Sequence, residues 1–239
     1  MKKIIFSPEK NFNLRCYIDS KVFSPTRTTE LIVKSIKNNK SKIKKNKKIL
    51  DLGCGSGVIG ISIKKKIFKK SKIFFSDLSE NAVKLTQKNI ILNKLKCDVK
   101  KSDLMQVWKN EKFDLIINDV SGISSFFLKK NFWYNKFIPC QSGLDGTKLT
   151  LKFFGSLKKR KGLVIIPLIS LSNVSKVKNY LNKKKINFKT ILKEDWPLPY
   201  SLINKHKKNL IKLKKKRLIN YKEKYGMFLA YTEILLLKL

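Results

Sequence analysis

The chain has 239 residues, of which 42% are hydrophobic, so it can bury one sizeable core. Lys and Arg number 55 against 16 Asp and Glu, a formal net charge of +39, yet the hydrophobic fraction is too high for a disordered polycation. The longest apolar stretch has about ten residues, well short of the roughly 20 that span a bilayer, and the first residues do not read as a signal peptide.

Strand and helix signals alternate along the chain, which is typical of a parallel α/β sheet. The first fifty or so residues are expected to form a short strand pair and a covering helix. Residues 47–52 predict a short buried strand, followed by a glycine loop and a helix over 57–66. A second strand over 73–76 precedes a helix over 79–93, with Ser79 as its N-cap.

Further strands are predicted at 98–101, 113–117 and 162–168, with a helix at 149–157 before the last of them. A helix over 172–183 follows, and the end carries two strand-like runs, 227–230 and 232–237. The chain has no internal repeat and no Gly/Ser-rich or Pro-rich linker. We therefore expect a single domain over 1–239, made of a short extension (1–47) and a core (48–239) with a basic insertion near 205–224.

Two C-terminal segments have more than one interpretation. The Lys-rich stretch 205–224 predicts a basic amphipathic helix that packs on the domain by one face. The run D-W-P-L-P-Y, Asp195 to Tyr200, predicts an extended loop in which two prolines hold a Trp and a Tyr. This loop either forms a wall of a substrate cleft or is a rigid connection.

The cysteines and the single histidine exclude several kinds of chemistry. Four cysteines lie about forty residues apart with no C-x-x-C pair, which is neither a zinc site nor a disulfide framework and fits a reducing cytoplasm. His206 stands among lysines, so metal hydrolysis and Ser-His-Asp catalysis are poorly supported. We expect no metal site.

The strongest motif is D-L-G-C-G-S-G-V-I-G, Asp51 to Gly60, placed between a predicted strand and a predicted helix. Gly53, Gly55 and Gly57 permit backbone angles and a ligand approach that a Cβ would block. The helix that follows offers free N–H groups to a polar or anionic group. The motif therefore predicts a nucleotide-type binding turn.

Gly55-x-Gly57-x-x-Gly60 also satisfies the dinucleotide fingerprint, so NAD is one candidate ligand. The Asp51 carboxylate argues against it, because a carboxylate repels a pyrophosphate and suits the ammonium group of S-adenosylmethionine. Asp77, at the end of the second strand, can accept hydrogen bonds from ribose hydroxyls of either ligand. Asp103 is placed to bind the adenine amino group, with Leu104 against the ring. Asp51 decides for S-adenosylmethionine.

These motifs resemble those of class I S-adenosylmethionine-dependent methyltransferases, and most closely the HemK/PrmC-like and small-domain methyltransferases. The segments P-T-R-T-T-E-L-I-V (25–33) and G-L-D-G-T-K-L (143–149) are similar to sequences that flank the glycine loop in those families. The resemblance covers roughly 22–168 and implies a Rossmann-like, mostly parallel seven-stranded sheet with an antiparallel C-terminal strand and helices on both faces. The implied cofactor-binding residues are Asp51, Gly53, Cys54, Gly55, Gly57, Asp77, Leu78, Asp103 and Leu104.

The chain departs from those families after the fourth strand of the core. They carry N-P-P-Y, where an Asn side chain and a proline carbonyl hold the nucleophilic nitrogen and an aromatic ring stacks on it. Here an ungapped match gives D-V-S-G, 119–122, and a one-residue shift puts Asn118 first. Asp119 can still accept a hydrogen bond from an N–H group, so Asp119 and Asn118 are the catalytic candidates. Stacking would need another ring, for which Phe126, Phe127, Trp133 and Tyr134 are candidates.

Three kinds of function remain open. The favoured one is N-methylation of a macromolecule, either a glutamine-type amide of a protein or an rRNA or tRNA base. The family's long N-terminal helical domain does not precede the loop, which makes a release factor a less favoured substrate. The others are a small-metabolite methyltransferase and a non-catalytic protein that binds the cofactor or RNA. The positive surface permits an RNA or ribosomal partner, but only four of the 55 basic residues are Arg, and codon drift alone would give the same composition.

Overall fold

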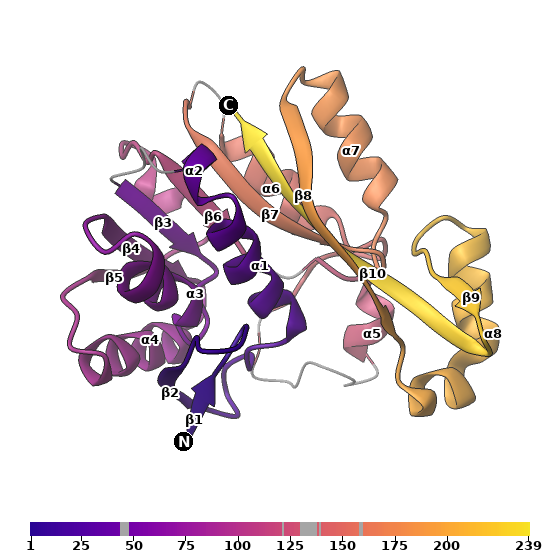
Figure 1. The fold of residues 1–239 in the computed structure, drawn as a ribbon. Coiled ribbons are helices and arrows are strands. Elements are labelled where there is room, and N and C mark those ends of the chain that lie inside the picture. The colour runs from indigo at the N-terminus through magenta and orange to yellow at the C-terminus, as the bar shows by residue number, and fades with distance from the viewer. Residues whose placement is uncertain (44–47, 121, 130–137, 139, 158–159) are drawn as a thin grey trace.

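The computed structural model describes residues 1–43, 48–120, 122–129, 138, 140–157 and 160–239, which Figure 1 shows as a ribbon. The strands are β1 (Lys2–Phe6), β2 (Leu14–Ile18), β3 (Lys48–Leu52), β4 (Lys72–Asp77), β5 (Asp98–Lys101), β6 (Leu115–Asn118), β7 (Leu163–Ile169), β8 (Asn187–Pro197), β9 (Lys222–Lys224) and β10 (Met227–Lys238). The helices are α1 (Arg27–Asn38), α2 (Lys40–Ile43), α3 (Val58–Ser62), η1 (Ile63–Ile67, a π-helix), α4 (Glu80–Leu92), η2 (Gln106–Trp108), α5 (Ser125–Lys129), α6 (Lys148–Ser156), α7 (Val174–Lys183) and α8 (Tyr200–Lys215).

The main sheet has the order β5-β4-β3-β6-β7-β10-β8, with β9 paired to one end of β10. Strands β3 to β7 pair in parallel, and β10 runs antiparallel to both of its neighbours, β7 and β8. This is the mostly parallel, seven-stranded arrangement with an antiparallel C-terminal strand that the sequence predicts, and the fold-class prediction is confirmed. The small strand β9 is an addition that the sequence did not predict.

Each central strand is buried on both faces, because its alternate side chains enter different hydrophobic clusters. In β3, Ile49 packs with the helices α1 and α3, whereas Leu50 and Leu52 pack with α6 and α7 on the opposite face. The same alternation recurs in β6 and β7. The two clusters therefore place helices on both faces of the sheet, as Figure 1 shows.

The N-terminal hairpin of β1 and β2 is fixed to α4 by asparagine side chains. Asn89 accepts a hydrogen bond from the Tyr17 N–H at 2.6 Å and donates to the Tyr17 carbonyl at 3.0 Å. Asn93 donates to the Arg15 carbonyl at 2.9 Å. Since α4 also follows β4 directly, these bonds bring the segment after β2 next to the carboxyl ends of the central strands.

The C-terminal region corrects two predictions. Asp195 to Pro197 form the end of β8 rather than a loop, and Tyr200 begins α8 with its side chain 79% exposed. The runs 227–230 and 232–237 form one continuous strand, β10, with a register irregularity opposite β8 between Ile234 and Leu235. Tyr231, which separates the two predicted runs, pairs with Asp195 of β8, so the ladder continues through it and the two runs form one strand.

The ends of β8 and β10 extend beyond the rest of the sheet and carry α8 and β9 at one side of the molecule (Figure 1). The predicted basic segment 205–224 thus divides into the end of α8, which has a kink at His206, and the strand β9. Helix α8 packs through Leu202 and Leu210, which are fully buried. Among the described helices, none is both long and apolar enough to cross a lipid bilayer.

Candidate functional site

The glycine motif forms a tight turn between β3 and α3, at the carboxyl edge of the sheet. Gly53 has a φ of 73°, and a Cβ there would lie 2.8 Å from Cγ1 of Val120. Gly55 has a φ of 56°, and a Cβ there would meet only the Phe23 carbonyl oxygen, at 3.7 Å. Gly53 is thus required by packing against the loop after β6, whereas Gly55 leaves open space above the turn.

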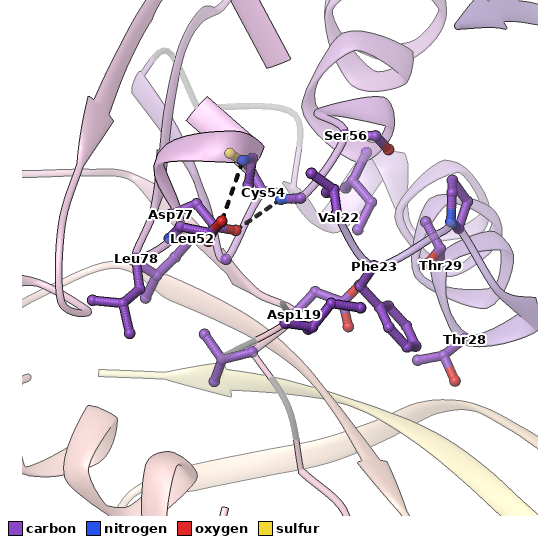
Figure 2. Close-up of a pocket in the computed structure, with 18 of the residues that line it drawn as sticks. Val22, Phe23, Thr28, Thr29, Leu52, Cys54, Ser56, Asp77, Leu78 and Asp119 are labelled. Atoms are coloured by element: carbon purple, nitrogen blue, oxygen red, sulfur yellow. Dashed lines mark hydrogen bonds between the residues drawn. The ribbon is translucent and has the colours of Figure 1, made fainter. Parts of the chain in front are cut away.

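Polar groups from β4 and α4 hold this turn in place. Asp77 accepts hydrogen bonds from the N–H groups of Gly55 and Ser79, both at 2.9 Å, and lies beside the turn in Figure 2. Thr86 donates to the Gly55 carbonyl at 3.0 Å, and Asn89 donates to the Ser56 carbonyl at 2.8 Å. Because its backbone is fixed from below, the turn is preorganised for a ligand.

Asp51 lies beneath the turn rather than on its surface. Its side chain has no solvent exposure, and one oxygen, Oδ2, accepts a hydrogen bond of 2.8 Å from the Gly60 N–H in the first turn of α3. Its other oxygen, Oδ1, has no hydrogen-bond partner among the described residues. A Cβ at Gly60 would lie 2.4 Å from the Phe75 ring and 3.0 Å from Asp51, so this glycine serves helix–sheet packing.

A cavity opens above the turn, and we call it the main cavity (Figure 2). Eight of the predicted cofactor-binding or catalytic residues line it: Gly53, Cys54, Gly55, Asp77, Leu78, Asp103, Leu104 and Asp119. Three others, Asp51, Gly57 and Asn118, are not among its lining residues. The sequence therefore identified most of one wall, while its proposed direct contact between Asp51 and a ligand does not match the place of that side chain.

The opposite wall of the main cavity comes from a segment to which the sequence assigned no site residue. Residues 21–26 and the start of α1 cover the glycine turn, and Phe23, Thr28 and Thr29 lie there in Figure 2. The available signal was the P-T-R-T-T-E motif itself. Its role is visible only once β2 is fixed to α4, because that contact joins residues far apart in sequence.

The turn after β5 forms the remaining side of the main cavity. Leu104 is buried with a φ of 49°, and its carbonyl accepts a 2.8 Å hydrogen bond from Ser102. Asp103 forms an ion pair with Lys152, with 2.5 Å between Oδ2 and Nζ. One carboxylate oxygen of Asp103 is therefore already paired with the ammonium group of Lys152.

Three carboxyl groups in this region have raised pKa values. Burial, with a smaller contribution from the nearby Asp77 carboxylate, raises the pKa of Asp51 to about 7, against the lowering effect of the hydrogen bond from the Gly60 N–H. Burial also raises the pKa of Asp77, against the lowering effect of its backbone hydrogen bonds. The pKa of Asp119 is raised well above its usual value by burial and then by the charge of Asp51. A cationic ligand relieves such a cluster, whereas a pyrophosphate would add to its repulsion.

The two catalytic candidates lie differently. Asp119 lines the main cavity, directly after β6, and its N–H is hydrogen-bonded to the Leu52 carbonyl at 3.1 Å. Asn118 is fully buried in β6, and its Oδ1 accepts a 3.2 Å hydrogen bond from the Val120 N–H. The ungapped match, with Asp119 at the first position of the motif, therefore fits the geometry better than the shifted one.

The aromatic rings proposed for stacking are distributed differently from the prediction. Phe127 is fully buried in a core cluster, and Phe126 contacts Phe127 and His206 rather than the main cavity. Trp133 and Tyr134 lie outside the described residues. Phe23 is the aromatic residue that lines the main cavity among the described residues, and Figure 2 shows its ring near Asp119.

A second, more apolar cavity adjoins the first and shares Phe23, Thr26, Thr28 and Ile169 with it; we call it the side cavity. Its other lining residues are Arg27, Ile123, Leu171 and Trp196. Arg27 is held by a bidentate pair with Glu194 of β8, with distances of 2.7 and 2.9 Å. Trp196, in the D-W-P-L-P-Y run, thus lines the side cavity, whereas Tyr200 lines neither the side cavity nor the main cavity.

Within the described part of the chain, no group of three or more His, Cys, Asp or Glu side chains could hold a metal ion. The four cysteines are free thiols, and burial raises the pKa of both Cys16 and Cys54. These thiols are therefore poor candidates for nucleophiles.

Residues 13–119 match the family model of the methyltransferase small domain. The chain is 31% identical over 191 residues to a release factor glutamine methyltransferase of Dictyoglomus turgidum, covering 74% of this chain and 65% of that protein. It is 39% identical over 110 residues to a ribosomal RNA small subunit methyltransferase C of Haemophilus influenzae, covering 45% and 31% of the two chains. The chain thus spans less than two thirds of the length of these relatives.

Solved structures share the fold at much lower sequence identity. The E. cuniculi Mtq2-Trm112 complex, described as methylating the eRF1 translation termination factor, has a chain with a TM-score of 0.58 and 13% identity, covering 91% of this chain and 98% of that one. A Pyrococcus abyssi tRNA (uracil-54, C5)-methyltransferase in complex with S-adenosyl-L-homocysteine has a TM-score of 0.51 and 13% identity, covering 99% of this chain and 44% of that one.

Proposed function

Because the chain has the class I methyltransferase fold and residues 13–119 belong to the methyltransferase small-domain family, we propose that it transfers a methyl group from S-adenosylmethionine to a nitrogen of a macromolecule. The observation that carries this proposal is the main cavity, in which the glycine turn, Asp77 and Asp119 lie together. The acceptor is a protein amide or an RNA base. Relatives named for a release factor and for ribosomal RNA support this choice.

The residues of the main cavity fit this cofactor on grounds of charge and space. Asp51 has a buried oxygen without a partner beneath the turn, and Asp77 and Asp119 add carboxyl groups to the lining of the main cavity, so an ammonium group is favoured. The space over Gly55 is open to a ligand. Asp77 keeps lone pairs for ribose hydroxyls beyond its two backbone hydrogen bonds. Leu78 and Leu104 offer apolar contact to a ring.

Bound in the main cavity, the cofactor supplies an electrophilic methyl group, and the transfer requires no covalent enzyme intermediate. The task of the protein is to hold the acceptor nitrogen in line and to exclude water. Asp119 accepts a hydrogen bond from the acceptor N–H and so orients its lone pair. Because burial raises the pKa of Asp119, this carboxylate is also suited to take up the proton that the nitrogen releases. Phe23 forms an apolar wall beside it.

The proposal includes a cytoplasmic setting and a translation-related partner. The free cysteines of the chain fit a reducing compartment. Relatives named for a release factor, ribosomal protein L11 and ribosomal RNA make a translation-related macromolecule the favoured acceptor.

Transfer of tritium from labelled S-adenosylmethionine into fractionated cell extract tests the proposed function. We expect label in the RNA or protein fraction with the wild type. Asp119→Ala removes both the accepting oxygen and the proton acceptor and should lower transfer at least about 100-fold. Asp119→Asn keeps an accepting oxygen but cannot take up the proton, so its transfer should lie between that of Asp119→Ala and that of the wild type. Label in the soluble small-molecule pool would support a metabolite methyltransferase instead, and no label in any fraction would contradict catalysis.

A further inference from the structure

Helix α8 carries a concentrated positive charge without internal compensation. The helix, Tyr200–Lys215, contains six lysines and no acidic residue, and Lys216 adjoins its end. The six are Lys205, Lys207, Lys208, Lys212, Lys214 and Lys215. None of these lysines forms an ion pair with a described residue, whereas lysines elsewhere, such as Lys37, Lys152 and Lys178, do.

The exposed lysines are arranged in a row. Lys208, Lys212 and Lys215 follow the kink at His206 at spacings of four and three residues, so they share one face of the helix, and all three are exposed. Like charges at these spacings destabilise a helix. The arrangement therefore has a cost in the free protein that a bound polyanion would remove.

The apolar side of α8 is already used inside the protein. Leu202 and Leu210 are fully buried in a cluster that also contains Ile123 and Leu171, two residues that line the side cavity. A surface helix that binds a membrane needs a free apolar face, and α8 has none of that kind. The same packing leaves the basic row on the outer side of a helix that shares a hydrophobic cluster with two residues of the side cavity.

Exposed aromatic rings lie at the two ends of the segment 200–225, which contains α8 and β9. Tyr200, the first residue of α8, is 79% exposed, and Tyr225 is 83% exposed. Tyr225 and Gly226 form the two-residue turn between β9 and β10, in which φ is 50° and 70°. A turn with two positive φ angles favours Asn-Gly, and a bulky residue in the first position is strained. Tyr225 therefore occupies a position that stability alone would give to Asn.

We propose that the row Lys208, Lys212 and Lys215, together with Tyr200 and Tyr225, is a docking surface for single-stranded RNA; this inference rests on the proposed function, whose acceptor it names as an RNA base. Lysines neutralise successive phosphates, and exposed rings stack on unpaired bases. A protein partner fits less well, because lysine is depleted in protein–protein interfaces. Helix α8 shares a hydrophobic cluster with Ile123 and Leu171 of the side cavity, and the side cavity in turn shares lining residues with the main cavity.

Fluorescence anisotropy with a short, unstructured, labelled RNA tests the basic row, measured without methyl donor between roughly 50 and 300 mM salt. Each lost phosphate contact lowers the slope of log affinity against log salt by about 0.7 for a single strand, so Lys208→Gln/Lys212→Gln should lower it by about 1.4. The charge-matched control is Lys183→Gln/Lys184→Gln, at the end of α7, where both side chains are exposed. If the two double variants change the slope equally, RNA binding depends only on the overall charge of the protein. That result would overturn the proposal.

Tyr225→Asn separates stacking from folding. We expect RNA affinity to fall about tenfold, because a base loses its stacking partner, while the melting temperature stays the same or rises. Unchanged RNA affinity in this variant would contradict the stacking role of Tyr225. Displacement of the RNA by poly-glutamate at equal charge concentration would identify a surface for acidic proteins and overturn the RNA assignment.

The outcome is distinguishable from failure of the proposed function, because binding is measured without methyl transfer. RNA binding that depends on α8, in a protein that transfers no methyl group, would leave the docking surface standing and remove the enzyme. Methyl transfer into the protein fraction, with RNA binding insensitive to changes in α8, would support the enzyme and overturn the docking surface.

Discussion

Asp51 acts through its position below the glycine turn. Its carboxylate receives the Gly60 N–H, one of the donors that the first turn of a helix leaves unpaired, and so it stabilises the start of α3. The remaining unpaired oxygen is costly to bury as an ion, which is why the pKa of Asp51 rises to about 7. The preference of the main cavity for a cation therefore comes from Asp51, Asp77 and Asp119 together rather than from one direct contact, because a bound cation favours their ionised forms.

The raised pKa of Asp51 predicts a pH dependence of stability. The unfolded chain loses this proton near pH 4 and the folded chain near pH 7, so the free energy of unfolding should fall as pH rises between these values. Asp51→Asn cannot ionise and keeps an acceptor for the Gly60 N–H. Its stability relative to wild type should therefore increase from pH 5 to pH 7, by at most about 1.4 kcal/mol per pH unit.

Urea unfolding of the wild type and of Asp51→Asn across this pH range measures the difference in their free energies of unfolding. Asp77 and Asp119 are present in both proteins. A constant difference between pH 5 and pH 8 would show that Asp51 is already ionised in the folded protein, and the explanation of its raised pKa would fail.

At the residue scale, the sequence identified the side chains that belong to local motifs and missed those that arrive by long-range packing. Gly55 and Asp77 follow predicted strands, so their meeting at one edge of the sheet could be predicted. Phe23 could not, because its place depends on the hydrogen bonds between Tyr17 and Asn89. The burial of Phe127, likewise, results from the C-terminal cluster that contains α8 residues.

At the scale of the elements, the turn between β3 and α3 has two glycines with different duties. Gly53→Ala would place a Cβ 2.8 Å from Val120, so the loop after β6 must move, and we expect the free energy of unfolding to fall by about 1–3 kcal/mol. Gly55→Ala meets no close atom, and only its positive φ opposes the change, at about 1 kcal/mol.

The variants Gly53→Ala and Gly55→Ala should also differ in their effect on ligand binding. The Gly55→Ala methyl group enters the main cavity, so S-adenosylmethionine affinity should fall at least tenfold with little loss of stability. Thermal melts and calorimetric titration of both variants measure the two effects. Equal affinity of Gly55→Ala and wild type would show that the ligand does not approach this turn.

The central strands and their helices were predicted within a few residues, because both faces of β3, β4, β6 and β7 are covered and leave strong hydrophobic runs. The C-terminal elements were harder. Strand β8 has a mixed burial pattern along its eleven residues and pairs on one side with β10 alone, so its local sequence gives a weak strand signal. Its continuation through Trp196 and Pro197 follows from that pairing.

The whole molecule must tolerate a formal net charge of +39. The ion pairs in the described structure are mostly exposed, and such pairs each contribute little to stability. We therefore expect repulsion among the lysines to dominate the electrostatic contribution to stability. It remains a prediction that residues 1–239 form one domain, and the contacts of the N-terminal hairpin with α4 support it.

Screening of this repulsion should stabilise the protein. Raising sodium chloride from roughly 0.05 to 0.5 M shortens the Debye length to a few ångströms, so the melting temperature should rise, by about 2–4 °C for each kcal/mol of repulsion removed. Differential scanning calorimetry at several sodium chloride concentrations measures this shift. A melting temperature that falls with salt would mean that attractive pairs outweigh the repulsion.

The proposed methyl transfer requires that the main cavity select S-adenosylmethionine. Isothermal titration calorimetry of the purified chain with S-adenosylmethionine, alone and in the presence of excess NAD, measures this selection directly. We predict one S-adenosylmethionine per chain with an affinity that NAD does not change, because the carboxylates favour an ammonium and repel a pyrophosphate. Binding of NAD together with exclusion of S-adenosylmethionine would contradict the assignment.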